Sequence, residues 1–253
     1  MEYRQLGRTG IEVSVLGLGT VKLGRDRGVD YARPFRLPTL REARRLVDRA
    51  HSLGINLIDT APAYGASEER LGELLAGQRR RWVIVTKVGE EFDGARSSHD
   101  FSPEHTAMSV RRSLKRLGTH WLDVVLIHSD GNDERILERH GTLDCLKRLK
   151  DEGLIRAAGI SHKSPEGARA AMNRGADVLM ATLNPGDLTQ AEVIEEAGER
   201  GCGVLVKKAL SGGRQEPRSL LLAVGHPGVS SVVIGTLDPE HLAENAEVLA
   251  AGD

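Results

Sequence analysis

The sequence predicts an α/β protein with a (β/α)8 TIM barrel and an N-terminal β-hairpin, with residues 1–253 forming a single barrel domain. Two observations predict the barrel: eight short apolar runs recur along the chain, and longer amphipathic segments separate them. The runs are largely unbroken, which is typical of parallel strands buried on both faces. They cover residues 13–19, 55–59, 82–87, 122–128, 155–161, 177–182, 203–208 and 231–236. A doubly wound sheet is the alternative, but no GxGxxG motif follows the first run.

The remaining elements have their own sequence signals. Residues 2–17 hold a glycine-centred turn between two β-prone pieces, which predicts a hairpin that plugs the lower end of the barrel. The first barrel strand would then lie around Leu16–Gly19. Residues 39–54 have a helical apolar face and end at Gly54; the face comprises Leu40, Ala43, Val47, Ala50 and Leu53. A capping residue followed by proline predicts three further helix starts, at Ser102-Pro103, Ser164-Pro165 and Asp238-Pro239.

The composition indicates a cytoplasmic protein and argues against several classes of partner. Lys plus Arg number 35 and Asp plus Glu 36, so the net charge of -1 gives no reason to expect nucleic acid or a membrane surface. Cys145 and Cys202 lack metal-ligand spacing, so we expect reduced thiols and no metal. The first ten residues lack the apolar core of a signal peptide. No heptad stretch occurs, and we expect a monomer or a small homo-oligomer.

Charged and titratable residues end several of the predicted strands. In a barrel of this kind the functional site lies at the C-terminal ends of the strands. Asp59, Lys87 and His128 end the second, third and fourth strands, and Tyr64 follows Asp59 in a turn-rich segment. Taken singly, each has a structural interpretation: a turn cap, a surface lysine, a core histidine and a residue covering the rim. Taken together at one mouth, they favour a catalytic site.

These four residue types suit the protonation of a carbonyl oxygen. We expect Asp59 to keep a buried Lys87 charged, and the ammonium of Lys87 to lower the pKa of Tyr64. His128 would donate a hydrogen bond to an oxygen held between itself and Tyr64. The sequence therefore predicts that Tyr64 acts as a general acid.

The chain resembles the aldo-keto reductase superfamily at these same residues. The matching segments are "EYRQLGRTGIEVSVLGLGT", "GINLIDTAPAYGASEERLG", "VIVTKVG", "LDVVLIH" and "VVIGTLDPEHLAEN". The resemblance implies hydride transfer from NADPH to an aldehyde or ketone, with a tetrad of Asp59, Tyr64, Lys87 and His128.

The resemblance also implies where the cofactor NADP(H) binds. Gly19, Thr20 and Val21 match the segment beside the nicotinamide and the pyrophosphate, and Ser161 and His162 match the pair at the carboxamide. Residues 209–214 resemble the loop over the pyrophosphate, and within it we expect contacts from Leu210, Gly212 and Arg214. The residues expected at the adenosine end are Gly235, Thr236, His241, Glu244 and Asn245.

Several positions depart from the usual family pattern. His162 replaces an asparagine, Met180 a glutamine and Leu183 an aromatic residue. His241 stands where an arginine usually grips the 2′-phosphate of NADPH, which leaves NAD(H) as an alternative cofactor. The segments "ISHKSPE" and "LNPGD" resemble one branch of the superfamily, some members of which are fused to iron–sulfur modules. Few residues lie between Gly213 and Ser230, so we expect an open pocket for a small polar or sugar-like carbonyl compound.

Two other functions compete with carbonyl reduction. The replaced glutamine and aromatic residue favour a barrel that binds a dinucleotide but has a regulatory or partner-binding role and little turnover. A lyase or aldolase would instead use Lys87 as a Schiff-base nucleophile. Asp59 opposes that chemistry, because it would keep Lys87 protonated.

Overall fold

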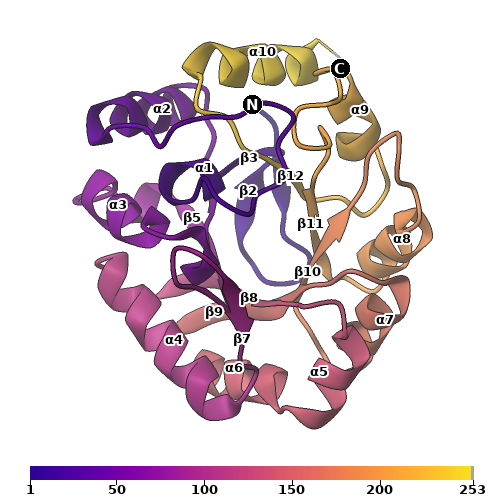
Figure 1. The fold of residues 1–253 in the computed structure, drawn as a ribbon. Coiled ribbons are helices and arrows are strands. Elements are labelled where there is room, and N and C mark those ends of the chain that lie inside the picture. The colour runs from indigo at the N-terminus through magenta and orange to yellow at the C-terminus, as the bar shows by residue number, and fades with distance from the viewer. Residues whose placement is uncertain (252–253) are drawn as a thin grey trace.

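The computed structural model describes residues 1–251 and confirms the predicted barrel (Figure 1). Eight parallel strands close into a ring, and helices surround it. Every predicted apolar run contributes one strand to this ring. In spatial order they are β3 (Leu16–Gly19), β4 (Leu57–Asp59), β5 (Val83–Val88), β8 (Leu122–His128), β9 (Ile155–Ser161), β10 (Val178–Thr182), β11 (Gly203–Lys207) and β12 (Ser231–Ile234), which pairs with β3 again.

The helices begin where the capping signals predict. Thr39 forms a capping box with Glu42 at the start of α2, and the side chains of Ser102, Ser164 and Asp238 accept backbone N–H groups at the starts of α4, α7 and α10. The helices are α1 (Val21–Gly24), α2 (Leu40–Ser52), α3 (Ser67–Leu74), α4 (Pro103–Arg116), α5 (Asp133–Arg139), α6 (Thr142–Asp151), α7 (Pro165–Asn173), α8 (Ala191–Glu199), α9 (Ser219–Val224) and α10 (Pro239–Ala250). Among the described residues, no helix has the length and apolar character needed to cross a bilayer.

The predicted N-terminal hairpin closes one end of the barrel. It consists of β1 (Tyr3–Gln5) and β2 (Glu12–Ser14), so the apolar run 13–19 is divided between the hairpin and β3. Leu6, Ile11 and Val13 are buried in one cluster with inward-facing strand residues such as Val124 and Leu205. The hairpin therefore forms the floor of the barrel interior.

Gly7 allows this hairpin to fit against the strands. Its φ is 56°, and a Cβ placed there would lie 2.3 Å from the backbone nitrogen of Gly203. Any other residue would force the turn away from β11. The glycine at this turn is thus required by close backbone contact as well as by its conformation.

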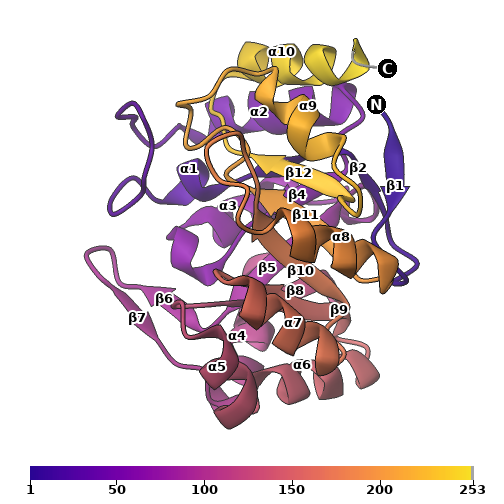
Figure 2. The ribbon, with the colours of Figure 1, turned by 90° about the vertical axis from the view of Figure 1, so that its right-hand side faces the viewer.

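A second hairpin stands at the opposite end, where the strands have their C-terminal ends. It comprises β6 (Glu90–Phe92) and β7 (Ser97–His99), and no pattern in the sequence predicts it. Figure 2 shows the two hairpins at opposite ends of the barrel, with the loop after α1 on the same side as β6 and β7. The strand ends that carry the predicted site therefore lie beneath added segments.

Candidate active site

Barrel topology brings the four predicted catalytic residues together. Asp59 ends β4 and Lys87 lies near the end of β5, and these strands are neighbours in the ring. His128 ends β8, which pairs with the other edge of β5. Tyr64 closes a short 3-10 turn, Pro62–Tyr64, directly after β4. Three consecutive strands of the ring, β4, β5 and β8, and the turn after β4 thus supply all four residues.

Lys87 is the centre of the group. Its Nζ donates to Asp59 Oδ1 at 2.6 Å, to the carbonyl oxygen of Thr60 at 2.9 Å and to the hydroxyl oxygen of Tyr64 at 3.0 Å. The Lys87 side chain is 1% exposed, so its charge depends on these partners. Because the phenol oxygen accepts from Lys87, the hydrogen of the phenol is left for another acceptor.

Burial dominates the protonation of these groups. It raises the pKa of Tyr64 well above its usual value, and the negative charge of Asp59 adds to that rise. We expected Lys87 to lower this pKa, but burial and Asp59 outweigh it, and the phenol stays protonated at neutral pH. Burial also lowers the pKa of Lys87, while Asp59 opposes that shift. Tyr64 therefore keeps its phenolic proton at neutral pH.

His128 contacts a carboxylate that the sequence did not predict. Its Nδ1 lies 2.8 Å from Oε2 of Glu90, the first residue of β6. Burial lowers the pKa of His128, and Glu90 opposes that shift. Burial alone would raise the pKa of Glu90, but His128, Ser97 and Arg25 together lower it. Glu90 therefore orients an imidazole that is neutral at neutral pH.

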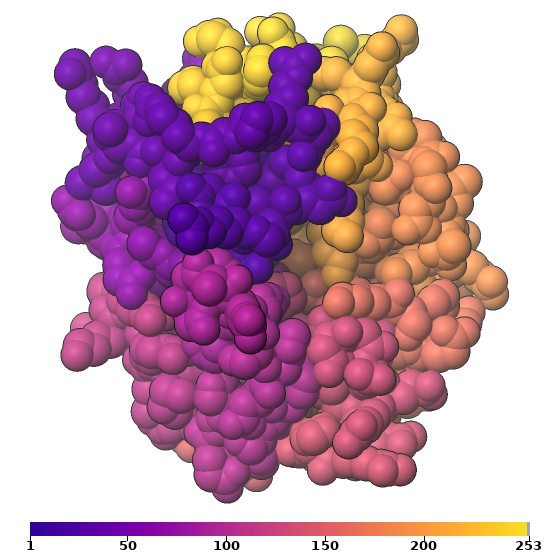
Figure 3. Space-filling view, viewed as in Figure 1, coloured from indigo at the N-terminus to yellow at the C-terminus, as the bar shows by residue number. Residues whose placement is uncertain are grey.

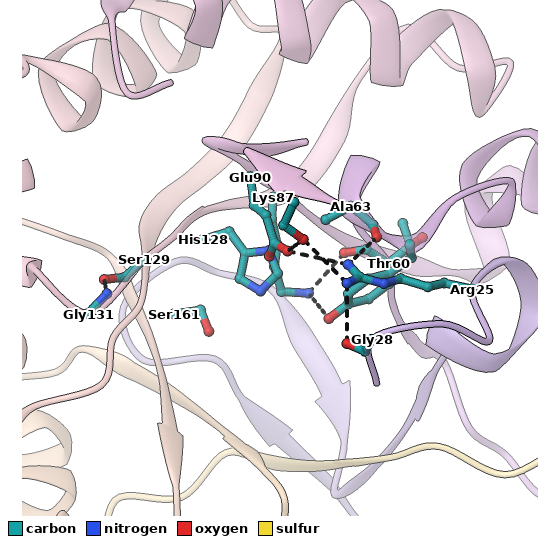
Figure 4. Close-up of polar contacts among 12 residues, drawn as sticks. Arg25, Gly28, Thr60, Ala63, Lys87, Glu90, His128, Ser129, Gly131 and Ser161 are labelled. Atoms are coloured by element: carbon teal, nitrogen blue, oxygen red, sulfur yellow. Dashed lines mark hydrogen bonds and ion pairs between the residues drawn. The ribbon is translucent and has the colours of Figure 1, made fainter. Parts of the chain in front are cut away.

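Arg25 fixes Glu90 from the other side. It is 8% exposed, lies just after α1, and places Nη1 3.0 Å from the carbonyl oxygen of Ala63 and 3.3 Å from Glu90 Oε1. The hydroxyl of Ser97 on β7 donates to the same carboxylate oxygen at 2.6 Å. Figure 4 shows Arg25, Glu90, Lys87 and His128 converging, with Ser161 apart from them. The second hairpin is thereby tied to the site.

The predicted cofactor residues lie along one arc of the mouth. Ser161 ends β9, residues 209–214 follow β11, Gly235 and Thr236 follow β12, and Gly19 ends β3. His241, Glu244 and Asn245 lie on α10, the helix after β12. A space-filling view onto this mouth shows a narrow recess near its centre (Figure 3).

Some of these residues already have partners within the chain. Thr20 is fully buried, and its hydroxyl donates to the carbonyl oxygen of Asp59 at 2.8 Å. Asn245 donates to the carbonyl oxygen of His241, one turn earlier in α10. Arg214 pairs with Asp30 at 2.6 Å, and the Ala32 amide donates to the carbonyl oxygen of Gly212 at 3.0 Å. Val21 begins α1, Leu210 is partly buried, and His241 and Glu244 are exposed.

Comparison with known proteins identifies the family. A model of the aldo/keto reductase family matches residues 15–222. The chain belongs to the aldo-keto reductase family. A crystal structure of a Pseudomonas aeruginosa protein assigned to the aldo-keto reductases superposes with a TM-score of 0.91; the two chains are 52% identical, covering 99% of this chain and 95% of that one.

Two curated relatives are more distant. L-galactose dehydrogenase from Arabidopsis thaliana is 31% identical over 226 residues, which is 84% of this chain and 66% of the relative. The NADH-specific methylglyoxal reductase of Escherichia coli is 33% identical over 197 residues, which is 72% of this chain and 58% of the relative. The chain thus spans about half to two thirds of the length of the curated relatives it matches.

Two of the predicted cofactor residues have a buried polar atom that is open to a ligand. Nε2 of His162 and Oδ1 of Asn245 are buried, and among the described residues neither has a hydrogen-bond partner. Buried polar atoms without partners are rare, so each is suited to a polar ligand group. His162 directly follows β9, and Asn245 lies on α10, the helix after β12.

Proposed function

We propose that this aldo-keto reductase reduces an aldehyde or ketone to an alcohol with NADP(H), and that Tyr64 is the general acid. The main support is the contact of one buried ammonium, that of Lys87, with both Asp59 and Tyr64. A bound nicotinamide would supply the hydride that reduces the carbonyl carbon. The chain's own residues then have to orient the carbonyl group and protonate its oxygen.

In this mechanism the phenol of Tyr64 donates its proton as negative charge develops on the carbonyl oxygen. The resulting phenolate is stabilised by Lys87 Nζ, which already donates to the same oxygen. The resting pKa of Tyr64 is raised, so its proton is transferred only when the carbonyl oxygen gains negative charge and becomes a strong enough base to take it. Asp59 keeps Lys87 charged throughout. Glu90 holds the ring of His128 against the same oxygen site.

The cofactor contacts we propose remain those expected from the sequence. Ser161 and His162 would hold the carboxamide, the loop 209–214 would lie over the pyrophosphate, and α10 would contact the adenosine. NAD(H) is the alternative to NADP(H). His241 is exposed, and its Nε2 lies 3.7 Å from Oδ2 of Asp238, a carboxylate that would repel a 2′-phosphate. The Escherichia coli relative is NADH-specific.

We propose a small polar or sugar-like carbonyl compound as substrate. The chain contains only 3% aromatic residues, so an aromatic-lined pocket for a large apolar substrate is disfavoured. One relative is named for L-galactose and another for methylglyoxal, both of which are small and polar.

The Tyr64→Phe variant tests the proposal. It should lower kcat/KM for carbonyl-dependent oxidation of NADPH by ~10²- to 10⁴-fold, because it removes the donated proton. Binding of NADPH, followed by fluorescence titration, should change little. Tyr3→Phe is the matched control, since Tyr3 lies in the N-terminal hairpin, where its hydroxyl donates to the carbonyl oxygen of Gly54. Unchanged turnover in Tyr64→Phe would rule out Tyr64 as the acid.

A further inference from the structure

The end of β11 holds an amine that has no acidic partner. Lys207 Nζ donates to the hydroxyl of Ser161 and to the carbonyl oxygen of His162, both at 2.8 Å. Both partners are neutral, and within residues 1–251 Lys207 forms no ion pair with a carboxylate. Lys87 differs in this respect, because Asp59 accepts directly from it. The proposed mechanism for Tyr64 makes no use of Lys207.

This amine lies at the mouth beside the proposed catalytic residues. Lys207 is the register partner of Thr182 on β10, yet its Nζ reaches across β10 to Ser161 at the end of β9. Ser161 is in turn the register partner of His128 on β8. The amine of Lys207 therefore sits next to the strand end that carries His128, on the face where a carbonyl substrate would enter.

The surroundings favour the uncharged amine. Burial is the largest cause, and with the positive charges of Lys208, Lys87 and Lys163 it lowers the pKa of Lys207 to about 7, against a weak opposing effect of Asp133. The charge of Lys207 also couples to two histidines, His128 on β8 and His162 just after β9. Lys207 is half-buried. A desolvated lysine near other cations is the usual setting of an amine that attacks carbonyl groups. At neutral pH a large share of Lys207 is therefore nucleophilic.

We propose that Lys207 is a second carbonyl-reactive group of this mouth and forms an imine with small aldehydes. The amine nitrogen attacks the carbonyl carbon, and a proton moves from nitrogen to oxygen to give a carbinolamine. Loss of the hydroxyl group as water then forms the C=N bond, with no change in oxidation state. The reaction needs no nicotinamide cofactor, so it is independent of the proposed reductase activity.

The structure assigns this role to Lys207 and not to Lys87. All three N–H groups of Lys87 have acceptors, and one acceptor is a carboxylate. These contacts favour the protonated amine, which has no lone pair for attack on a carbonyl group. Lys207 has two neutral acceptors, and within residues 1–251 its third position has no acceptor. Lys208, the next residue, is the natural control because it has the same side chain one position further along.

Reductive trapping tests the proposal. The full chain, without nucleotide, is incubated with glycolaldehyde and sodium cyanoborohydride, which reduces an imine to a stable secondary amine, and modified lysines are located by peptide mass spectrometry. We expect Lys207 to be the first residue modified, with a rate that rises ~10-fold per pH unit below pH 7 and levels off above it. Lys207→Met and Lys207→Arg should lose this fast modification. Lys208→Met and Lys163→Met should still be modified first at Lys207, with the rise in rate moved to higher pH because a neighbouring positive charge is removed.

Three results would overturn the proposal: slow labelling of Lys207 together with the surface lysines, fast labelling of Lys87, or fast labelling that survives in Lys207→Arg. Lys207→Arg keeps the positive charge and the donors, so it serves where Lys207→Met fails to fold, as judged by circular dichroism. Carbonyl-dependent oxidation of NADPH is measured separately. Its absence would reject the proposed reductase and leave the trapping result standing.

Discussion

At the scale of single residues, the ion pair of Asp59 and Lys87 links stability to the proposed chemistry. The two side chains are 6% and 1% exposed, so each charge depends on the other. Lys87→Met should destabilise the fold by about 3–5 kcal/mol, because it leaves the Asp59 carboxylate buried without its cation. Urea unfolding measures this loss.

A double substitution provides the control for that loss. Lys87→Met combined with Asp59→Asn removes both charges and should recover most of the lost free energy of unfolding, since no unpaired charge remains buried. The double variant should still lack carbonyl reduction. A double variant as unstable as Lys87→Met alone would show that packing, and not the buried charge, determines the cost.

The sequence located the proposed tetrad but not the residues that support it. Asp59, Lys87 and His128 could be predicted because each ends an apolar strand, and strand ends meet at one face of a barrel. Glu90 and Arg25 contact each other only after two loops fold over that face, and no local pattern reports such a contact. Lys207 lies near the end of the apolar run 203–208, but its lack of a carboxylate partner within residues 1–251 is a property of the folded mouth.

At the scale of elements, two loops meet over the proposed cofactor arc. The segment after α1 reaches the loop after β11 through the Arg214–Asp30 ion pair and the Ala32–Gly212 hydrogen bond. The side chains of the ion pair are 48% and 77% exposed, so the pair adds little to global stability. It holds the two loops side by side rather than stabilising the barrel.

Arg214→Ala tests that distinction. It should change the free energy of unfolding by less than ~1 kcal/mol, yet increase hydrogen–deuterium exchange of the Ala32 amide several-fold, because the loop contact opens more often. Arg200→Ala is the matched control, since its exposed pair with Glu196 lies on α8. Equal exchange at Ala32 in both variants would mean that the backbone contact alone holds the loops.

Helix boundaries were predictable and the second hairpin was not. The caps at Ser102, Ser164 and Asp238 are local interactions, so their residue types predict them. The strands β6 and β7 are three residues each and mostly polar, and they lack the apolar periodicity that marks a strand; β6 is half-buried and β7 is exposed. Their position follows from contacts made by Arg25 and His128, which are distant in sequence.

At the scale of the whole molecule, the barrel follows from the eight apolar runs because unbroken runs need cover on both faces. Only the division of the first run was uncertain, since residues 13–19 serve both the hairpin and the barrel. The physical reason lies in Val13, which points into the barrel interior as part of the hairpin floor.

The stability of the whole fold should fall in mild acid because of His162. This side chain is fully buried, and burial, reinforced by Lys207, lowers its pKa to about 4. In the unfolded chain a histidine has a pKa of about 6.5, so between these values the unfolded state binds more protons. The contribution of His162 to stability is therefore complete above about pH 6.5 and is lost as the pH falls toward 4, by up to ~3 kcal/mol.

His162→Asn should flatten that part of the pH profile of the free energy of unfolding, measured by urea unfolding from pH 4 to 8. His120→Asn, at an exposed position, controls for the loss of a histidine, and an unaltered slope in His162→Asn would assign the acid sensitivity to other groups.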